Sequence, residues 1–197
     1  MGLKISTGNL RGKTLVSTEN ARELRPTQAL IREAIINTCL SYFDFDFTKV
    51  NVLDVFAGTG AVGFEFMSNQ ANSVLFIERD PKCLKLIKTN IKNLNLISVA
   101  KLFPLAAETA IKKLSGKFFE IIFLDPPYSL APKKFEKIVE NILEAKLLSE
   151  QALLVIESGS GNWIDPPNDG CLNALHLVKK KDYGDSSIFF YTSDTKK

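Results

Sequence analysis

The stretch Asp54-Val55-Phe56-Ala57-Gly58-Thr59-Gly60-Ala61-Val62-Gly63 decides the fold of this chain, and its three glycines satisfy the pattern G-x-G-x-x-G. An apolar, β-rich run over residues 50–56 leads into it, and a helix-type run over residues 61–68 follows it. Glycines permit a tight turn between strand and helix and let backbone N–H groups approach a ligand closely. The stretch therefore predicts a ligand-binding turn at the carboxyl end of a strand in an α/β sheet.

Outward from this turn, strand-type and helix-type segments alternate. We predict strands over residues 50–56, 73–77, 98–103, 118–124 and 152–156, and helices over residues 61–68, 81–94, 106–114 and 132–145. This alternation is typical of a mostly parallel sheet with helices on both faces. Two further strands, over residues 172–179 and 186–192 around a turn at Tyr183-Gly184-Asp185, predict an antiparallel pair at one edge.

The first 45 residues do not follow this alternation. Short β-type stretches over residues 3–7 and 14–17 flank a Gly8–Gly12 segment, which predicts a small β-hairpin. A helix is predicted to begin at Pro26-Thr27, with the Thr27 side chain as its cap. We therefore divide the chain into an N-terminal extension, residues 1–45, and a core domain, residues 46–197.

Composition excludes several classes of protein. The chain has 197 residues, 45% of them hydrophobic, and a net charge of +3, which permits a nucleic-acid partner without requiring one. No apolar run approaches the roughly 18 residues of a membrane helix, so no membrane association is expected. His176 is the only histidine and the three cysteines form no C-x-x-C pair, which argues against a metal site, a disulfide framework and a Ser-His-Asp triad. We expect a cytoplasmic monomer without metal.

Two carboxylates near the glycine turn indicate what it binds. Glu78 ends the next strand, 20 residues after Gly58, and can accept hydrogen bonds from two ribose hydroxyls. Asp54 suits a cationic group, such as the amino group of a methionine moiety, better than a pyrophosphate. A nicotinamide-dependent oxidoreductase, and tight strand–helix packing with no ligand, remain alternatives. Asp54-x-Phe56-Ala57-Gly58-x-Gly60 resembles motif I of the class I S-adenosylmethionine-dependent methyltransferases, which have a Rossmann-like fold.

A second motif, Asp125-Pro126-Pro127-Tyr128, follows the apolar strand of residues 118–124. The two prolines fix the backbone and cannot donate hydrogen bonds, so the carbonyl near Pro126 is left as an acceptor beside Asp125. With the flat face of Tyr128, these acceptors suit a planar ring that carries an exocyclic NH₂ group. Asp125 can also take the released proton. The tetrapeptide resembles motif IV of methyltransferases acting on adenine N6, cytosine N4, guanine N2 or a glutamine amide.

The N-terminal segment resembles one family in particular. Residues 4–15 look like the opening of the RsmD family, the bacterial 16S rRNA guanine-N2 methyltransferases, and Arg25-Pro26-Thr27, continuing to Arg32 and Asn37, resembles that family's second signature. Tyr183-Gly184-Asp185, just before the last predicted strand, also resembles the sequence of this family at that position. This resemblance implies S-adenosylmethionine as donor and a guanine N2 of 16S rRNA, within the small ribosomal subunit or its assembly intermediate, as acceptor.

Site residues follow from the motifs and the resemblance. The predicted sets are catalytic Asp125, Pro126, Pro127 and Tyr128; donor-binding Asp54, Phe56, Ala57, Gly58, Gly60 and Glu78; and RNA-binding Arg11, Lys13, Arg25, Thr27 and Arg32. Glu157 is either part of the acceptor cleft or a surface charge. The Lys179-Lys180-Lys181 run is expected to be an ordinary solvated surface.

Two departures from the family stand out. Lys4 and Lys13 replace the usual arginines and lose the bidentate guanidinium. The acid that many such enzymes carry after the third strand is missing, and Glu108 is the nearest candidate to contact adenine. An adenine-N6 methyltransferase and a non-catalytic RNA-binding module remain alternatives.

Overall fold

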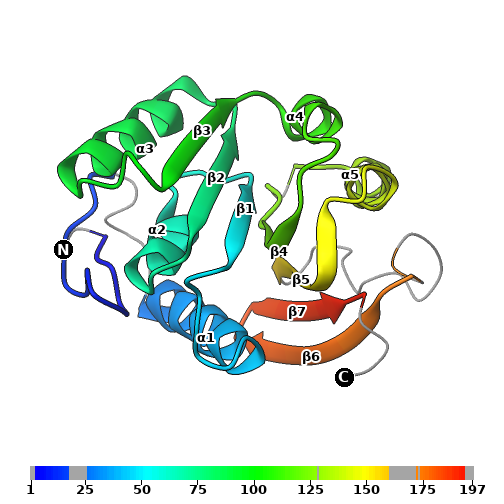
Figure 1. Cartoon of the computed structure of the whole chain (residues 1–197), viewed down its shortest axis with the longest axis horizontal. Coiled ribbons are helices and arrows are strands. Elements are labelled where there is room, and N and C mark those ends of the chain that lie inside the picture. The colour runs from blue at the N-terminus through cyan, green and yellow to red at the C-terminus, as the bar shows by residue number, and fades with distance from the viewer. Residues whose placement is uncertain (1–2, 18–25, 128, 160–171, 173, 194–197) are drawn as a thin grey trace.

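The computed structural model describes residues 3–17, 26–127, 129–159, 172 and 174–193, with the backbone alone for residues 26–28 (Figure 1). The elements are α1 (Pro26–Tyr42), β1 (Asn51–Val55), α2 (Ala61–Ser68), β2 (Ser73–Glu78), α3 (Pro81–Asn93), β3 (Ala100–Pro104), α4 (Ala107–Lys113), β4 (Phe119–Leu124), α5 (Pro132–Glu144), β5 (Leu148–Gly159), β6 (His176–Tyr183) and β7 (Ser186–Thr192).

The strands form one mixed sheet in the order β3-β2-β1-β4-β5-β7-β6. Neighbours from β3 to β5 run parallel, whereas β7 is antiparallel to both β5 and β6. The predicted α/β fold, with an antiparallel pair at the C-terminal edge, is confirmed. Strands β2 and β3 extend the sheet on one side of β1, and β4 and β5 extend it on the other. The order reverses between β1 and β4, and in such sheets ligands bind at the carboxyl ends of the strands at this switch point.

Helices cover both faces of the sheet (Figure 1). The first core joins apolar residues of α1, α2 and α3 to one face, and the second joins α4 and α5 to the other. Successive residues of one strand serve opposite cores: Phe123 of β4 packs in the first and Leu124 in the second. Burial of each such side chain contributes about 1.5–3 kcal/mol, and together they hold the strand ends that carry the motifs.

The N-terminal hairpin packs on α2. Lys4 and Thr14 form an antiparallel bridge, and the Leu15 N–H donates to the Leu3 carbonyl at 2.8 Å. At its tip the Asn9 N–H donates to the Ser68 carbonyl at 2.7 Å. Gly8 has φ +72°, and a β-carbon there would overlap Ser68, so this close approach requires glycine.

Hairpin, α1 and sheet share one hydrophobic core. Leu3, Ile5 and Leu15 of the hairpin and Ile35 of α1 are buried in the core that also contains Phe64 of α2. The extension therefore packs against the sheet through α1 and α2. No helix in the described part of the chain is long and apolar enough to cross a bilayer.

Three predictions about local structure were wrong. Helix α1 begins at Pro26, so Thr27 lies inside the first turn and cannot be its N-cap. Strand β5 starts four residues before the predicted residue 152, because its polar first half continues the sheet beside β4 as far as the Phe119–Leu148 pair. Strand β6 runs over His176–Tyr183 rather than residues 172–179, because an edge strand with exposed positions accommodates lysines that rarely occur in a buried strand.

Candidate active site

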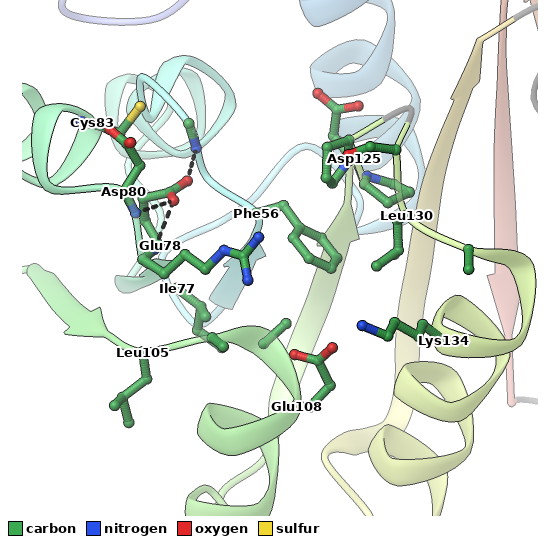
Figure 2. Close-up of a pocket in the computed structure, with 18 residues that line it drawn as sticks. Phe56, Ile77, Glu78, Asp80, Cys83, Leu105, Glu108, Asp125, Leu130 and Lys134 are labelled. Carbon is green, nitrogen blue, oxygen red and sulfur yellow. Dashed lines mark hydrogen bonds between the residues drawn. The ribbon is translucent and has the colours of Figure 1, made fainter.

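A cavity of about 530 Å³ opens at the carboxyl ends of β1, β2 and β4 (Figure 2). Its wall includes six of the predicted site residues, namely Phe56, Gly58, Glu78, Asp125, Pro126 and Pro127. The volume lies within the range of small-molecule and cofactor sites. The glycine turn and the Asp-Pro-Pro turn, about 70 residues apart in sequence, thus face one space.

The backbone of the glycine turn is tightly folded. The Ala57 N–H donates to the Ile77 carbonyl at 3.0 Å, and the Gly60 N–H donates to the Ala57 carbonyl at 2.7 Å. Ala57 and Gly60 therefore shape the turn rather than line the cavity wall. Phe56 adopts φ +63°, which is a strained conformation for a bulky residue and one that concentrates at ligand sites. Its ring projects into the cavity between Glu78 and Asp125 (Figure 2).

The Glu78 carboxylate is fixed by the backbone around it. Oε2 accepts from the Gly58 N–H at 2.7 Å, and Oε1 accepts from the N–H groups of Arg79 at 2.7 Å and Asp80 at 2.8 Å. An ionised carboxylate has about four acceptor sites, so three N–H donors leave capacity for a ligand hydroxyl. Glu78 is thus a rigid acceptor at the cavity wall, in the position predicted for the ribose ligand.

Asp54 lies beneath the turn instead of in the cavity wall. Its side chain is buried, with 2% exposure, and Oδ2 accepts from the Gly63 N–H at 3.1 Å. Loss of solvation raises its pKa to about 8; the Gly63 hydrogen bond opposes this shift, and the charges of Asp125 and Glu78 add to it. Asp54 therefore holds the start of α2 against β1 from beneath the turn, and its contact with a cationic ligand group stays a prediction.

Asp125 and Glu157 form an acidic pair at the ends of neighbouring strands. Leu124 of β4 pairs with Ile156 of β5, so the two acids follow directly at the same level of the sheet. Asp125 is exposed at the cavity. The surrounding protein nevertheless removes much of the water from its carboxyl group, and this loss of solvation raises its pKa to about 6. Burial and then the charge of Asp125 raise the pKa of Glu157, and the nearby Arg32 guanidinium opposes the shift. The pair is therefore poised to take up or release a proton near neutral pH.

The predicted RNA-binding residues divide into two groups. Arg11 and Lys13 are exposed on the hairpin. Arg32 is buried, with its Nε 3.4 Å from Glu65 Oε1 and its Nη2 donating to the Lys4 carbonyl at 3.1 Å. These contacts make Arg32 a link between α1, α2 and the hairpin. Arg25 and Tyr128 lie outside the described residues, as does the side chain of Thr27.

The rest of the cavity wall comes from segments without a motif. Leu105 and Ala106 follow β3, and with Ile77 they make an apolar surface beside the glycine turn. Glu108 of α4 and Lys134 of α5 line it from two neighbouring helices, and their charged ends point toward each other (Figure 2). Sequence reasoning placed Glu108 near this site because it follows β3, but nothing in the pattern of α5 distinguished Lys134 from its neighbours.

A family model described as conserved hypothetical protein 95 matches residues 3–192. The chain is 31% identical to ribosomal RNA small subunit methyltransferase D of Buchnera aphidicola from Acyrthosiphon pisum, over 97% of this chain and 93% of that protein. It is 28% identical to the protein of the same name from Haemophilus influenzae, over 96% and 93% of the two chains.

Solved structures show the same fold at lower identity. The SAH-bound methyltransferase PaMTH1 of Podospora anserina superposes with a TM-score of 0.65 at 14% identity, over 89% of this chain and 82% of that one. Because the family model spans nearly the whole chain, the match includes the hairpin, the glycine turn and the Asp-Pro-Pro turn together. The chain belongs to the family described as conserved hypothetical protein 95, which is the RsmD family that its motifs resemble.

Proposed function

We propose that this chain transfers a methyl group from S-adenosylmethionine to the exocyclic N2 amine of a guanine in 16S rRNA. The observation that carries the proposal is the placement of Asp125 and Pro126 on the wall of the same cavity as Gly58 and Glu78. Relatives named ribosomal RNA small subunit methyltransferase D, aligned over almost the full chain, support rRNA as the substrate.

The residues of the cavity fit the donor. Glu78 has acceptor capacity for ribose hydroxyls, and its three backbone hydrogen bonds hold it in one orientation. Ile77, Leu105 and Ala106 offer an apolar surface for the adenine ring. The bound donor supplies a methyl carbon whose bond to sulfur breaks as the amine nitrogen bonds to it, and the bonding electrons stay on sulfur.

The Asp-Pro-Pro turn prepares the amine. An exocyclic amine is a poor nucleophile because its lone pair is delocalised into the ring. Hydrogen bonds from its two N–H groups to the Asp125 carboxylate and the Pro126 carbonyl favour a nitrogen geometry with the lone pair free. This is catalysis by positioning and electrostatics. On sequence grounds we keep Tyr128 as the stacking partner of the base, which must leave its helical stack to reach the turn.

The proton released from the amine passes to Asp125, and Glu157 stabilises the product of that step. Two neighbouring carboxyl groups hold one proton more readily than either holds it alone, because protonation relieves the repulsion between their charges. Leu124 pairs with Ile156, so the two carboxyl groups follow at the same level of neighbouring strands, which supports this pairing.

Docking of the RNA is assigned to residues 1–45. Exposed Arg11 and Lys13 on the hairpin, with Arg25 and Thr27, are proposed to contact phosphates of the small ribosomal subunit. Arg32 acts by fixing the hairpin through Glu65. An rRNA substrate would place the activity in the cytoplasm, and we propose separately that the chain acts as a monomer.

Transfer of label from S-adenosylmethionine to three substrates tests the proposal. Purified protein is incubated with small ribosomal subunits, with deproteinised 16S rRNA and with DNA. We expect label in the ribosomal RNA of the first or second sample and none in DNA. Label only in DNA would contradict an RNA substrate, and no label in any sample would contradict the methyltransferase activity for these substrates.

A further inference from the structure

A second hollow, of about 390 Å³, lies away from the active-site cavity, between α1 and the edge strand β6 with its neighbour β7. Asn37, Thr38 and Ser41 of α1 line one side, and Lys179 and Lys181 of β6 line the other, with Phe190 of β7 between them. Amide, hydroxyl and ammonium groups thus face one another across a groove, and Asp44 is the one acidic residue in its described wall.

The three consecutive lysines of β6 point to different sides of the sheet. Lys179 and Lys181 pair with Phe190 and Ile188, which belong to the core beneath α1, whereas Lys180 pairs with Phe189 of the opposite core. Side chains alternate along a strand, so Lys179 and Lys181 share the face of the groove and Lys180 does not.

Lys180 also differs from Lys179 and Lys181 in the charged groups around it. The Lys180 Nζ lies 3.4 Å from Asp182 Oδ1 and 5.3 Å from the centre of the Phe189 ring, so its charge is compensated within the strand pair. Within the described residues, no carboxylate lies within ion-pair distance of Lys179 or Lys181.

Lys179 and Lys181 bring two positive charges to one side of the groove, where Asp44 is the one carboxylate of the described wall. Partial burial and then the charge of Lys179 lower the pKa of Lys181, so its environment disfavours the ammonium form. A phosphate between the two ammonium groups would reverse that effect, because an opposite charge within about 4–6 Å stabilises a charged group.

The groove also offers contacts to a sugar. Thr38 donates its hydroxyl hydrogen to the Ala34 carbonyl at 2.8 Å, which leaves its oxygen as an acceptor toward the groove it lines. A ribose 2′-hydroxyl can donate to such an acceptor, whereas deoxyribose has no group there. Arg32 lies in the N-terminal half of the same helix, and its charge opposes the rise that burial causes in the pKa of Glu157. Helix α1 therefore extends from the groove toward the acidic pair of the active site.

We propose that the groove between α1 and β6 binds the sugar–phosphate backbone of the RNA substrate, with Lys179 and Lys181 as its phosphate ligands. This inference rests on the proposed function, since it takes RNA as the substrate. It adds a docking surface along α1 to the exposed hairpin lysine and arginine, and it assigns different roles to three adjacent residues of the same type. RNA would therefore contact both the extension and the C-terminal edge of the sheet.

Single substitutions of the three lysines by glutamine provide a matched test, because they make the same chemical change at neighbouring positions. Binding of 16S rRNA is measured directly, without donor, over a range of salt concentrations. We expect Lys179→Gln and Lys181→Gln each to weaken binding about three- to tenfold and to lower the slope of log affinity against log salt by about 1. Lys180→Gln should bind like the unchanged protein. In transfer assays the two groove variants should raise KM for RNA and leave kcat unchanged.

The outcomes separate this inference from the proposed function. Equal weakening by all three substitutions, or by none, would overturn the groove as an RNA site. Equal loss of affinity for a DNA strand of the same length would show a general polyanion surface and would also overturn it. If the unchanged protein methylates no RNA, the proposed function fails, whereas the difference between the lysines in direct binding remains measurable.

Discussion

At the scale of single residues, Asp125 has the most direct part in the proposed chemistry. Asp125→Ala removes the acceptor that aligns the amine, and we expect kcat for RNA methylation to fall about 10²- to 10⁴-fold, the usual contribution of such groups. Calorimetric titration with S-adenosylhomocysteine should give nearly unchanged affinity, because Glu78 and the glycine turn remain. Asp125→Asn, which keeps one acceptor oxygen, should lose less activity than Asp125→Ala. Full activity of both variants would exclude Asp125 from the reaction.

The acidic pair predicts how activity depends on pH. The pKa of Asp125 is raised to about 6, and the ionised form is the one that accepts from the amine, so kcat/KM should rise as pH increases through this range. The pKa of Glu157 is raised to about 8, mainly by burial, so Glu157 is uncharged in the pH range where Asp125 titrates. Glu157→Gln exchanges one uncharged side chain for another, and the acid limb of the rate profile should therefore stay near pH 6. A limb that moves to lower pH would show that Glu157 is ionised beside Asp125 and would contradict this order of titration.

At the scale of elements, the contact between β1, α2 and β2 depends on Gly63. A β-carbon at this position would overlap the Phe76 ring and crowd Asp54 Oδ2. Gly63→Ala should destabilise the protein by about 1–3 kcal/mol, the cost of overpacking a core, as measured by urea unfolding. Gly116→Ala is the control, because its β-carbon would meet no atom within 4 Å and only its φ of +81° would be strained. A larger loss for the control would contradict this packing argument.

Glu65 joins the hairpin to the rest of the molecule. It is buried, with 1% exposure, and accepts from the N–H groups of Ser6 at 2.8 Å and Thr7 at 3.0 Å as well as from Arg32. Glu65→Ala removes the carboxylate that Arg32 contacts, and breaking a buried ion pair costs about 3–5 kcal/mol. Hydrogen exchange should accelerate in residues 3–17 more than in the sheet. Uniform exchange across the protein would show that the hairpin does not depend on this contact.

Elements with a strong local pattern were predictable, and those set by their neighbours were not. Helix α2, Ala61–Ser68, and strand β7, Ser186–Thr192, have their predicted bounds because a glycine turn and an apolar run mark them. The polar start of β5 has no such signal, since its place in the sheet comes from pairing with β4. Strand β6 was displaced by four residues at its start because exposed lysines are compatible with both a loop and an edge strand.

In the candidate site, too, the residues marked by a local sequence pattern were predictable, and those placed by packing were not. The position of Glu78 and Asp125 at the cavity could be predicted, because Glu78 ends an apolar strand and Asp125 directly follows one. The burial of Asp54 beneath the turn could not be deduced, because it depends on where Gly63 directs its N–H. The internal role of Arg32 likewise depends on how α1 packs against α2. An arginine in a basic segment suggests RNA binding in the sequence. The sequence alone does not show whether its side chain is exposed or paired with a carboxylate inside the protein.

At the scale of the whole molecule, the net charge of +3 conceals a separation of charge. Basic side chains are exposed on the hairpin and line the groove along β6, whereas carboxylates gather at the carboxyl ends of β1, β2, β4 and β5. Such a distribution attracts an RNA backbone at the periphery and leaves the centre for the uncharged, hydrogen-bonding edge of a base. It agrees with a folded ribonucleoprotein as substrate, for which shape adds to the attraction of phosphates.

The identity of the methylated nucleoside tests the central claim most directly. Ribosomal RNA labelled by the protein from S-adenosylmethionine is digested to nucleosides and separated by chromatography beside standards. The proposed mechanism predicts that label elutes with N2-methylguanosine and disappears with the Asp125→Ala variant. Label that elutes with N6-methyladenosine would contradict it.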